Sequence, residues 1–260
     1  MGEVVLKARE GGVMRLAINR PERRNALNES VAQGLIAGLD EAEADSSLRV
    51  VVLTGVGEEA FCAGGDLKPA ADGTPFALDA ADPRHYVVAL LKRMDACRLP
   101  LIARLNGHAL AGGFGLACAC DLVVAREDAL IGAPEARVGL FPMMILPYLM
   151  RVISYRTLMQ LCITGEPMTA AEAAKREIVN AAVPAGELDA TLAALVAGIV
   201  SKSPTGIRLG KQALARIREM SLDSALEYAQ FMLANMARTE DAREGFAAFN
   251  ERRKPAFTGR

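Results

Sequence analysis

The sequence predicts an α/β protein that ends in a helical region. Apolar runs of strand length alternate with helical patterns as far as Val183, which is typical of strands and helices packed in layers. From Glu187 onward the strand patterns stop, and helical stretches separated at Pro204 and Ser221 continue to the end of the chain. Because 260 residues are close to the limit of one hydrophobic core, we expect a core of residues 1–200 and a helical region of residues 201–260.

Turn residues and apolar spacing predict the N-terminal elements. Two β-rich runs, Val4–Ala8 and Val13–Asn19, are separated by Gly11-Gly12, which indicates a hairpin. After a charged loop, Asn28 is placed to cap a helix whose apolar face repeats every four residues, at Val31, Leu35 and Leu39.

The middle of the chain alternates strands with connecting segments. Arg49–Thr54 is a continuous apolar run, the pattern of a strand buried on both faces. Residues 69–83 are rich in proline and are expected to form an irregular loop over the candidate site. Tyr86–Arg98 has a helical pattern, and Leu101–Leu105 is a further strand that Asn106-Gly107 ends.

The remaining core elements are predicted in the same way. A small-residue helix is expected from Ala111 to about Cys120. A strand, three helices and a last strand follow: Asp121–Arg126, Pro142–Ile153, Thr157–Ile163, the short helix after the capping box Thr169–Glu172, and Ile178–Val183. Pro147 is expected to kink the first of these three helices, because proline removes a backbone donor inside a helix.

Composition and charge exclude several classes of function. The net charge is −1 and the basic cluster Arg252–Lys254 is short, so no nucleic-acid partner is expected. His85 and His108 are too few for a His-rich metal site, and the five cysteines are expected to be buried thiols. No apolar run approaches the ~18 residues of a membrane span, and no signal-peptide pattern begins the chain, so we expect a cytoplasmic protein without membrane contact.

Glycines at a predicted helix start and one downstream glutamate carry the candidate chemistry. Gly112 and Gly113 open the small-residue helix, and N–H groups there can receive a negatively charged oxygen at close range. Glu135 follows a proline and is expected in a loop or at a helix start. N–H donors and a nearby carboxylate together suit chemistry next to a carbonyl. The alternatives are a tightly packed helix start and a surface glutamate paired with Arg137.

Three motifs in order resemble the crotonase family, also called the enoyl-CoA hydratase/isomerase family. They are Arg24-Asn25-Ala26-Leu27, Phe61-Cys62-Ala63-Gly64-Gly65-Asp66-Leu67-Lys68, and the stretch 104–140. The resemblance covers essentially the whole chain and implies a spiral of ββα units followed by C-terminal helices that mediate trimer contacts. It therefore implies a homotrimer or a dimer of trimers, and an acyl-CoA thioester as substrate. CoA enters as part of that substrate, and neither a cofactor nor a metal is expected.

The resemblance also implies roles for individual residues. The backbone N–H groups of Gly65 and Gly112 match the family's donors to the thioester oxygen, and Glu135 matches its catalytic glutamate. Contacts to CoA are implied for residues of the motifs and of the C-terminal arm: Arg24, Ala26, Ala63, Asp66, Leu67, Lys68, Lys254 and Phe257.

The sequence departs from the best-known hydratases at Gly115, where those proteins carry a second glutamate. We expect an enzyme of the broad hydratase/isomerase type, with a Δ3-Δ2-enoyl-CoA isomerase as the alternative, because one carboxylate suffices to move a proton between two carbons of the acyl chain. Hydration stays open if Glu135 serves both proton transfers, and a third interpretation is an acyl-CoA binder without catalysis. Because Gly115 lies three residues after Gly112, we expect it to face the same site. His108 and Asp121 are expected to be structural.

Overall fold

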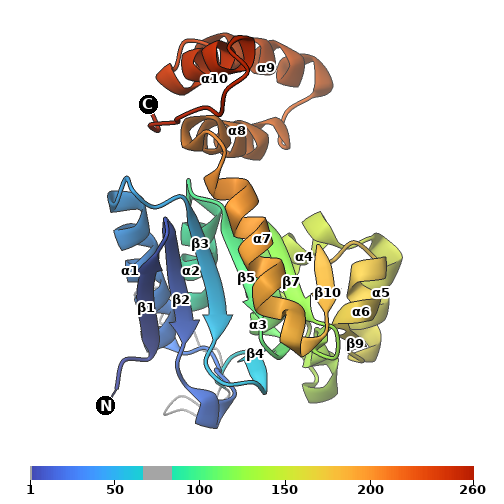
Figure 1. Ribbon diagram of the computed structural model, residues 1–260. Helices are drawn as coiled ribbons and strands as arrows, with labels where there is room; N and C mark the ends of the chain where they lie inside the picture. The colour runs from blue at the N-terminus through green and yellow to red at the C-terminus, as the bar shows by residue number, and fades with distance from the viewer. Residues whose placement is uncertain (1, 67–83) are drawn as a thin grey trace.

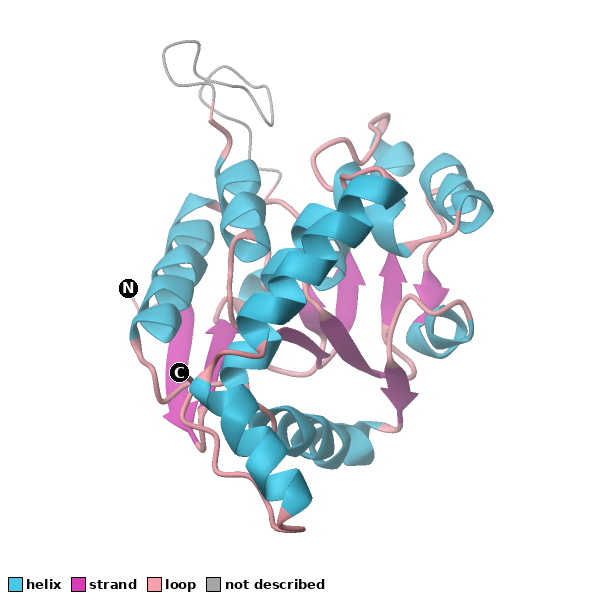
Figure 2. Ribbon diagram, turned by 90° about the horizontal axis from the view of Figure 1, so that it is seen from above, coloured by secondary structure: helices cyan, strands magenta, loops and turns pink. Residues whose placement is uncertain are grey.

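The computed structural model describes residues 2–66 and 84–260. Within them the strands form a six-stranded sheet in the order β1-β2-β3-β5-β7-β10 and a four-stranded sheet in the order β4-β6-β8-β9. Helices flank the strands on both sides (Figures 1 and 2). The α/β class is confirmed, whereas the loop expected at 69–83 lies outside the described residues.

The large sheet begins with the predicted hairpin. β1 (Val5–Glu10) pairs antiparallel with β2 (Val13–Ile18), and the turn glycines have positive φ angles of 54° and 83°. The next strands all run parallel to β2: β3 (Val50–Gly55), β5 (Leu101–Leu105), β7 (Leu122–Arg126) and β10 (Ala181–Val183). Every residue of β3 is buried, as its continuous apolar run predicted.

Helices from distant parts of the sequence cover this sheet. α1 (Glu29–Ala44) begins at Asn28, whose side chain accepts the Val31 N–H at 2.9 Å, so the predicted cap is confirmed. α1 packs against α2 (Tyr86–Asp95). Another cluster joins Leu192 of α7 (Leu188–Val200) to three residues of β3 and β5: Val50, Val52 and Ile102.

The small sheet consists of strands of two or three residues, which the sequence did not predict. Its members are β4 (Ala60–Cys62), β6 (His108–Leu110), β8 (Leu130–Gly132) and β9 (Met168–Thr169). Runs this short show no measurable period of two in the sequence. Turn residues beside them, such as Asn106-Gly107 before β6, indicate a loop instead. α3 (Gly112–Ala119) follows β6 after one connecting residue, as the predicted small-residue helix.

The expected kink at Pro147 is wrong. α4 covers Leu146–Val152, so Pro147 lies in its first turn, where the missing N–H has no acceptor to lose. α5 (Tyr155–Thr164) and α6 (Ala170–Lys175) follow, and the Thr169 hydroxyl accepts the Glu172 N–H at 3.2 Å, as expected for a cap. The last strand is only Ala181–Val183, because the Ile178 N–H donates to the Ala173 carbonyl of α6 at 2.9 Å rather than to a strand.

The C-terminal region is helical, as predicted. After α7 the chain turns at residues 201–203 and forms α8 (Pro204–Ile217), α9 (Leu222–Met236) and α10 (Glu240–Asn250). Asp241, which is 1% exposed, accepts hydrogen bonds from the Ser203 hydroxyl and from the Thr258 and Gly259 N–H groups. These bonds fold the end of the chain back onto α8 and α10. The division at residue 200 into two units stays a prediction.

α8 contacts the core at the amino ends of two strands. Lys211 Nζ donates to the Leu99 carbonyl at 2.9 Å and pairs with Asp121 at 2.6 Å, just before β5 and β7. Figure 1 shows α8, α9 and α10 beyond one end of the large sheet, with β4 at the opposite end. Asp121 also accepts the Leu101 N–H, which confirms that Asp121 is structural.

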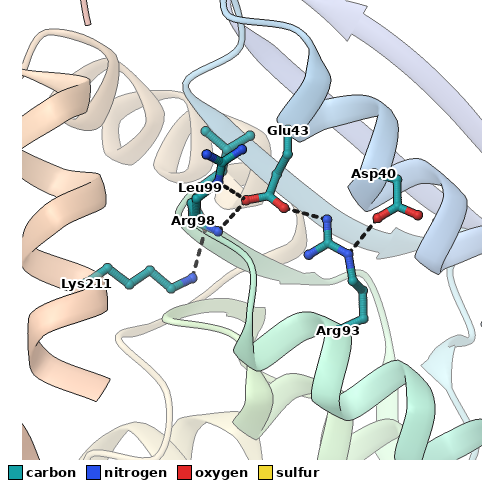
Figure 3. A network of polar contacts seen from close by, with 6 residues as sticks. All are labelled: Asp40, Glu43, Arg93, Arg98, Leu99 and Lys211. Carbon is teal, nitrogen blue, oxygen red and sulfur yellow. Dashed lines mark hydrogen bonds and ion pairs between the residues drawn. The ribbon is translucent and has the colours of Figure 1, made fainter. Parts of the chain in front are cut away.

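A polar network joins α1 and α2 next to this contact (Figure 3). Arg93 donates to Asp40 and Glu43, and Arg98 donates to Glu43 from its backbone and its side chain. Burial alone would raise the pKa of Glu43, but the bonds from Arg98 and the charge of Arg93 bring it below its ordinary value. Glu43 is therefore an ionised group that joins the two helices to the residues before β5.

Other features bear on the excluded classes of function. All five cysteines are free, and four of them are buried. In the described ranges 2–66 and 84–260, no cluster of three His, Cys, Asp or Glu side chains could hold a metal. In the same ranges no single helix is long and apolar enough to cross a membrane, although the pair Ala185–Val200 and Pro204–Ile217, bent by 97°, passes the test of length and composition.

Candidate active site

Three parallel strands of the small sheet end side by side. Cys62 of β4 is opposite Ala109 of β6, and Leu110 of β6 is opposite Gly132 of β8. The segments that leave these strands therefore start from the same edge: residues 63–66, Ala111-Gly112, and residues 133–135. The carboxyl ends of parallel strands are the usual place for a ligand site in open α/β sheets. The fold thus brings together Gly65, Gly112 and Glu135, and their roles stay predictions.

The two glycine segments touch each other. A Cβ built at Gly112 would lie 3.6 Å from the Gly65 nitrogen, and one built at Gly64 would lie 2.8 Å from Ala111 Cβ. Leu27 holds the first segment in place, because it donates to the Gly64 carbonyl and accepts the Asp66 N–H, each at 2.7 Å. Neither the Gly65 nor the Gly112 N–H donates to another described residue. Both are available as donors.

The backbone is strained directly before the second candidate donor, the Gly112 N–H. Ala111 has φ 50° and ψ −124°, a region that residues with a Cβ rarely adopt. Its N–H donates to the Gly132 carbonyl at 2.9 Å, and its carbonyl accepts the Gly115 N–H at 3.1 Å. These bonds tie Ala111 to β8 and to the first turn of α3, and so fix the backbone directly before Gly112. No pattern in the sequence predicts this strain.

Gly113 allows α3 to approach β4 closely. A Cβ at this position would lie 2.0 Å from the Cys62 carbonyl oxygen and 2.7 Å from the Cys62 carbonyl carbon. Backbone at such a distance leaves no room for any side chain. Gly113 therefore fixes the separation between α3, which carries Gly112, and the strand that leads to Gly65.

Glu135 is desolvated and lacks a partner on one oxygen. It lies in the 3-10 helix Pro134–Val138, which directly follows β8. Its Oε2 is buried and has no hydrogen-bond partner among the described residues, and burial raises the pKa of the carboxyl. Arg137 pairs with Glu166 at 2.7 Å, so the alternative of a surface pair between Glu135 and Arg137 is not observed. A buried carboxylate with an unpartnered oxygen is suited to accepting a proton.

Four of the residues expected to bind CoA lie around the first glycine segment. The Ala63 N–H donates to the Arg24 carbonyl at 3.0 Å, and Arg24 has a positive φ of 49° and pairs with Glu59. Arg20, which the sequence analysis did not select, donates to the Ala26 carbonyl at 2.7 Å and to Asp66 at 2.9 Å. Arg20 thus joins two of the three motifs.

The other expected CoA contacts are not brought to this edge. Leu67 and Lys68 lie outside the described residues. Lys254 and Phe257 belong to the C-terminal region, where Phe257 lies 3.6 Å from a Cβ built at Gly245 of α10. Because α8, α9 and α10 lie at the far end of the molecule from β4 (Figure 1), these two residues do not join the site of their own chain.

Two buried asparagines support the turn before β4. Asn25 and Asn106, 1% and 4% exposed, both donate to the Ala60 carbonyl, at 2.7 and 3.1 Å. Asn106 also accepts the Gly55 N–H at 2.9 Å. The sequence analysis assigned Asn106 only to a turn; its position after a buried strand could have suggested a structural amide. His108 accepts the Leu130 N–H through Nδ1 at 2.9 Å, so it is structural, as expected.

Gly115 does not face open space, contrary to our expectation. A Cβ built there would lie 2.1 Å from Ile145 Cγ2 and 2.6 Å from Ile145 Cβ. Ile145, just before α4, is 3% exposed. The space in which a side chain at 115 would lie is thus already filled by hydrocarbon.

Known proteins resemble this chain over its whole length. A family model described as enoyl-CoA hydratase/isomerase matches residues 8–260. A protein of Mycobacterium bovis named "Probable enoyl-CoA hydratase echA8" is 37% identical over 99% of each chain. The 2,3-dehydroadipyl-CoA hydratase of Escherichia coli is 34% identical over all of both chains.

Solved structures agree with this likeness. An enoyl-CoA hydratase from Mycobacterium tuberculosis superposes with a TM-score of 0.88 at 33% identity over all of both chains. A structure from Geobacillus kaustophilus gives a TM-score of 0.90 at 32% identity, over 99% of this chain and 98% of the other. Fold and motifs together define an enzyme that acts on acyl-CoA. The chain belongs to the enoyl-CoA hydratase/isomerase family, which confirms the resemblance to crotonases.

Proposed function

We propose that this protein transfers protons on the acyl chain of an enoyl-CoA thioester, by hydration or by migration of the double bond. The observation that carries the proposal is the shared edge of β4, β6 and β8. The segments that leave this edge bear two glycine N–H groups without a described partner and a carboxylate with one buried oxygen. Removing a proton from the α-carbon of a thioester places negative charge on its carbonyl oxygen. That oxygen is the group for which paired N–H donors are suited.

In this mechanism the N–H groups of Gly65 and Gly112 bind the thioester oxygen as an oxyanion hole. Backbone donors held by Leu27 and Ala111 need no reorganisation as charge develops. Losing one such donor typically costs about 3–4 kcal/mol of transition-state stabilisation. Glycine suits both positions, because no side chain obstructs the approach of the oxygen.

Glu135 moves the protons. Its burial raises the pKa of the carboxyl above the ordinary value, which suits a group that both accepts and returns a proton. In hydration it protonates the α-carbon or activates water, and in migration it carries a proton between two carbons. The names of the relatives favour hydration for those proteins, while Gly115 leaves this chain without a second carboxylate in α3.

The C-terminal helices support assembly into a homotrimer or a dimer of trimers in the cytoplasm. Large apolar side chains on α8, α9 and α10 are more than half exposed in the single chain: Leu214, Leu222, Leu226, Phe231, Leu233, Phe246 and Phe249. Exposed apolar surface of this extent is typical of an interface between subunits. In such an assembly Lys254 and Phe257 would contact the CoA of a neighbouring subunit.

Isotope exchange tests the proposed function. The protein is incubated in D₂O with 2-enoyl-CoA and 3-enoyl-CoA thioesters of several lengths, and the products are followed by mass spectrometry. We expect deuterium at the α-carbon with hydrated or isomerised product, and Glu135→Gln should lower turnover about 10²–10⁴-fold with thioester binding retained.

Glu166→Gln is the matched control, because Glu166 is a nearby glutamate whose partner is Arg137 on the surface. It should keep its activity. Nearly full activity of the Glu135→Gln variant on a good substrate would show that this carboxylate is not the base.

A further inference from the structure

The Ile145 side chain fills the space that the missing side chain of Gly115 leaves open. Among the described glycines that meet another side chain, Gly115 has the closest approach, 2.1 Å from a built Cβ to Ile145 Cγ2. Even a methyl group at 115 would therefore displace Ile145. Conversely, shortening Ile145 would open space in front of Gly115.

This contact lies one helical turn from a donor of the proposed oxyanion hole. Gly115 follows Gly112 by three residues in α3, and residues at this spacing share a face of a helix. Ile145 is held there by its own backbone, whose N–H donates to the Pro142 carbonyl at 3.3 Å and whose carbonyl accepts the Leu149 N–H at 3.2 Å. The wall that α3 and Ile145 form one turn from Gly112 is thus a branched hydrocarbon on a fixed backbone.

A wall of this kind gives an ordered water nothing to bind. A water held in a protein typically needs two to four polar partners, and isoleucine and glycine side chains offer none. Addition of water to the β-carbon lacks a positioning group on this wall. Glu135, on the segment after β8, is the group that remains for proton transfer.

Migration of a double bond needs only that one carboxylate. Glu135 takes a proton from the α-carbon of a 3-enoyl thioester, and the electron pair of that bond moves onto the thioester oxygen, where the two glycine N–H groups hold the charge. The same carboxyl then returns its proton to the γ-carbon, and the double bond moves to the α,β position. The atoms and charges balance without water or any co-reactant.

We propose that Ile145 is a specificity-determining residue, which by filling the space beside Gly115 directs the site to double-bond migration rather than water addition. The proposal rests on the proposed function. A polar side chain at 115 fits only when Ile145 is shortened, so water addition assisted by such a side chain requires both changes.

The test measures the ratio of 3-hydroxyacyl-CoA to 2-enoyl-CoA formed from a 3-enoyl-CoA substrate, together with hydration of 2-enoyl-CoA. The wild type should give mainly the migrated enoyl product. Ile145→Ser opens the space and supplies a hydroxyl that can bind water, so it should raise the ratio about tenfold, and Gly115→Glu combined with Ile145→Gly should raise it about 10²-fold, the lower range for a placed acid or base. Ile153→Ser is the matched control: it makes the same replacement in a buried residue at the end of α4 and should leave the ratio unchanged.

A stability cycle checks the geometry independently of activity. Gly115→Ala should lower the melting temperature, and adding Ile145→Ala should restore part of the loss, because the two changes relieve each other. An unchanged product ratio in folded, thioester-binding Ile145→Ser protein would overturn the inference even if the double variant did not fold. Mainly hydrated product from the wild type would also overturn it, while leaving the proposed function intact. A wild type that exchanges no α-proton with any enoyl-CoA would overturn both.

Discussion

The two ends of the core differ in how they satisfy their polar groups. At the carboxyl ends of β4, β6 and β8, two glycine N–H groups and Glu135 Oε2 have no partner among the described residues. At the amino ends of β5 and β7, Asp121 accepts both the Leu101 N–H and Lys211 Nζ, and Glu43 accepts two arginines (Figure 3). The first end keeps its binding capacity for a ligand, whereas the second uses it to hold the fold.

Backbone strain follows the same division. Of the five non-glycine residues with positive φ in the described ranges, three lie in the motifs at the site: Arg24, Asn25 and Ala111. Strain persists only where surrounding bonds enforce it, and at the site those bonds come from neighbouring segments. The division is not complete, because Thr205 Oγ1 at the start of α8 is also buried without a partner. A lone hydroxyl costs less to bury than a carboxylate.

Gly113→Ala should have the largest effect at the carboxyl ends of β4, β6 and β8. Its Cβ would collide with the Cys62 carbonyl, so α3 and β4 must separate and the two donors move apart. We expect kcat to fall about 10²-fold, as for a 1 Å misplacement of catalytic groups, and the free energy of unfolding to fall by about 1–3 kcal/mol. Steady-state kinetics and denaturant melts measure the two effects. A folded variant with wild-type kcat would show that this spacing is not needed.

Arg20→Ala should have a smaller effect on the same end. The side chain is 14% exposed, and its guanidinium joins Asp66 to the Ala26 carbonyl, so its loss releases the segment after Gly65. We expect about a tenfold loss in kcat/KM and about 1.5–3 kcal/mol of unfolding free energy. Arg20→Lys keeps the charge but cannot reach both partners in the same geometry, and should be intermediate. Equal activity of all three proteins would remove Arg20 from the description of the site.

Glu135→Gln should stabilise the protein at neutral pH. Burial raises the pKa of this carboxyl above its ordinary 4.5, so the folded state binds the proton more tightly than the unfolded state. Stability is therefore lost as the pH rises through the folded-state pKa, and glutamine avoids this loss. Melting temperatures from pH 4 to pH 8 should show a gain for the variant that shrinks as the pH falls. A variant that melts lower than wild type at pH 7 would contradict the assigned burial.

Lys211→Met should affect only the opposite end. Methionine keeps most of the apolar stem but removes the bonds to Leu99 and Asp121. We expect a loss of about 1 kcal/mol in unfolding free energy, reduced at high salt, with kcat unchanged. Chemical denaturation at two salt concentrations and an activity assay test this. A fall in kcat comparable to that of Arg20→Ala would mean that the two ends are not independent.

Much of the fold could be predicted because its signals are long. The helix capped by Asn28 spans four turns, and the buried run that became β3 has no polar interruption until Thr54. The small sheet could not be predicted, since strands of two or three residues carry no period. The site depends on that sheet, because its registers bring three distant segments to one edge.

The candidate residues were found by resemblance, but their surroundings were not. Nothing in the local sequence indicates that Ala111 has a left-handed φ or that Ile145 fills the space before Gly115. Both facts arise from packing between segments far apart in the chain. The prediction of a kink at Pro147 was wrong for a local reason. The effect of a proline depends on where its helix begins, and helix boundaries are the least certain part of a sequence-based prediction.

The contact of Lys211 with the core joins segments that are synthesised at different times. Its bonds to Leu99 and Asp121 span 112 and 90 residues of chain. During synthesis, at about 5–20 residues per second, Lys211 follows Asp121 by roughly 5–20 s, whereas the three segments of the site precede residue 136. The nascent chain therefore contains every residue of the site edge before it contains the cation that covers the other end. The edge that bears the candidate residues is complete in sequence first, and the C-terminal helices are synthesised last.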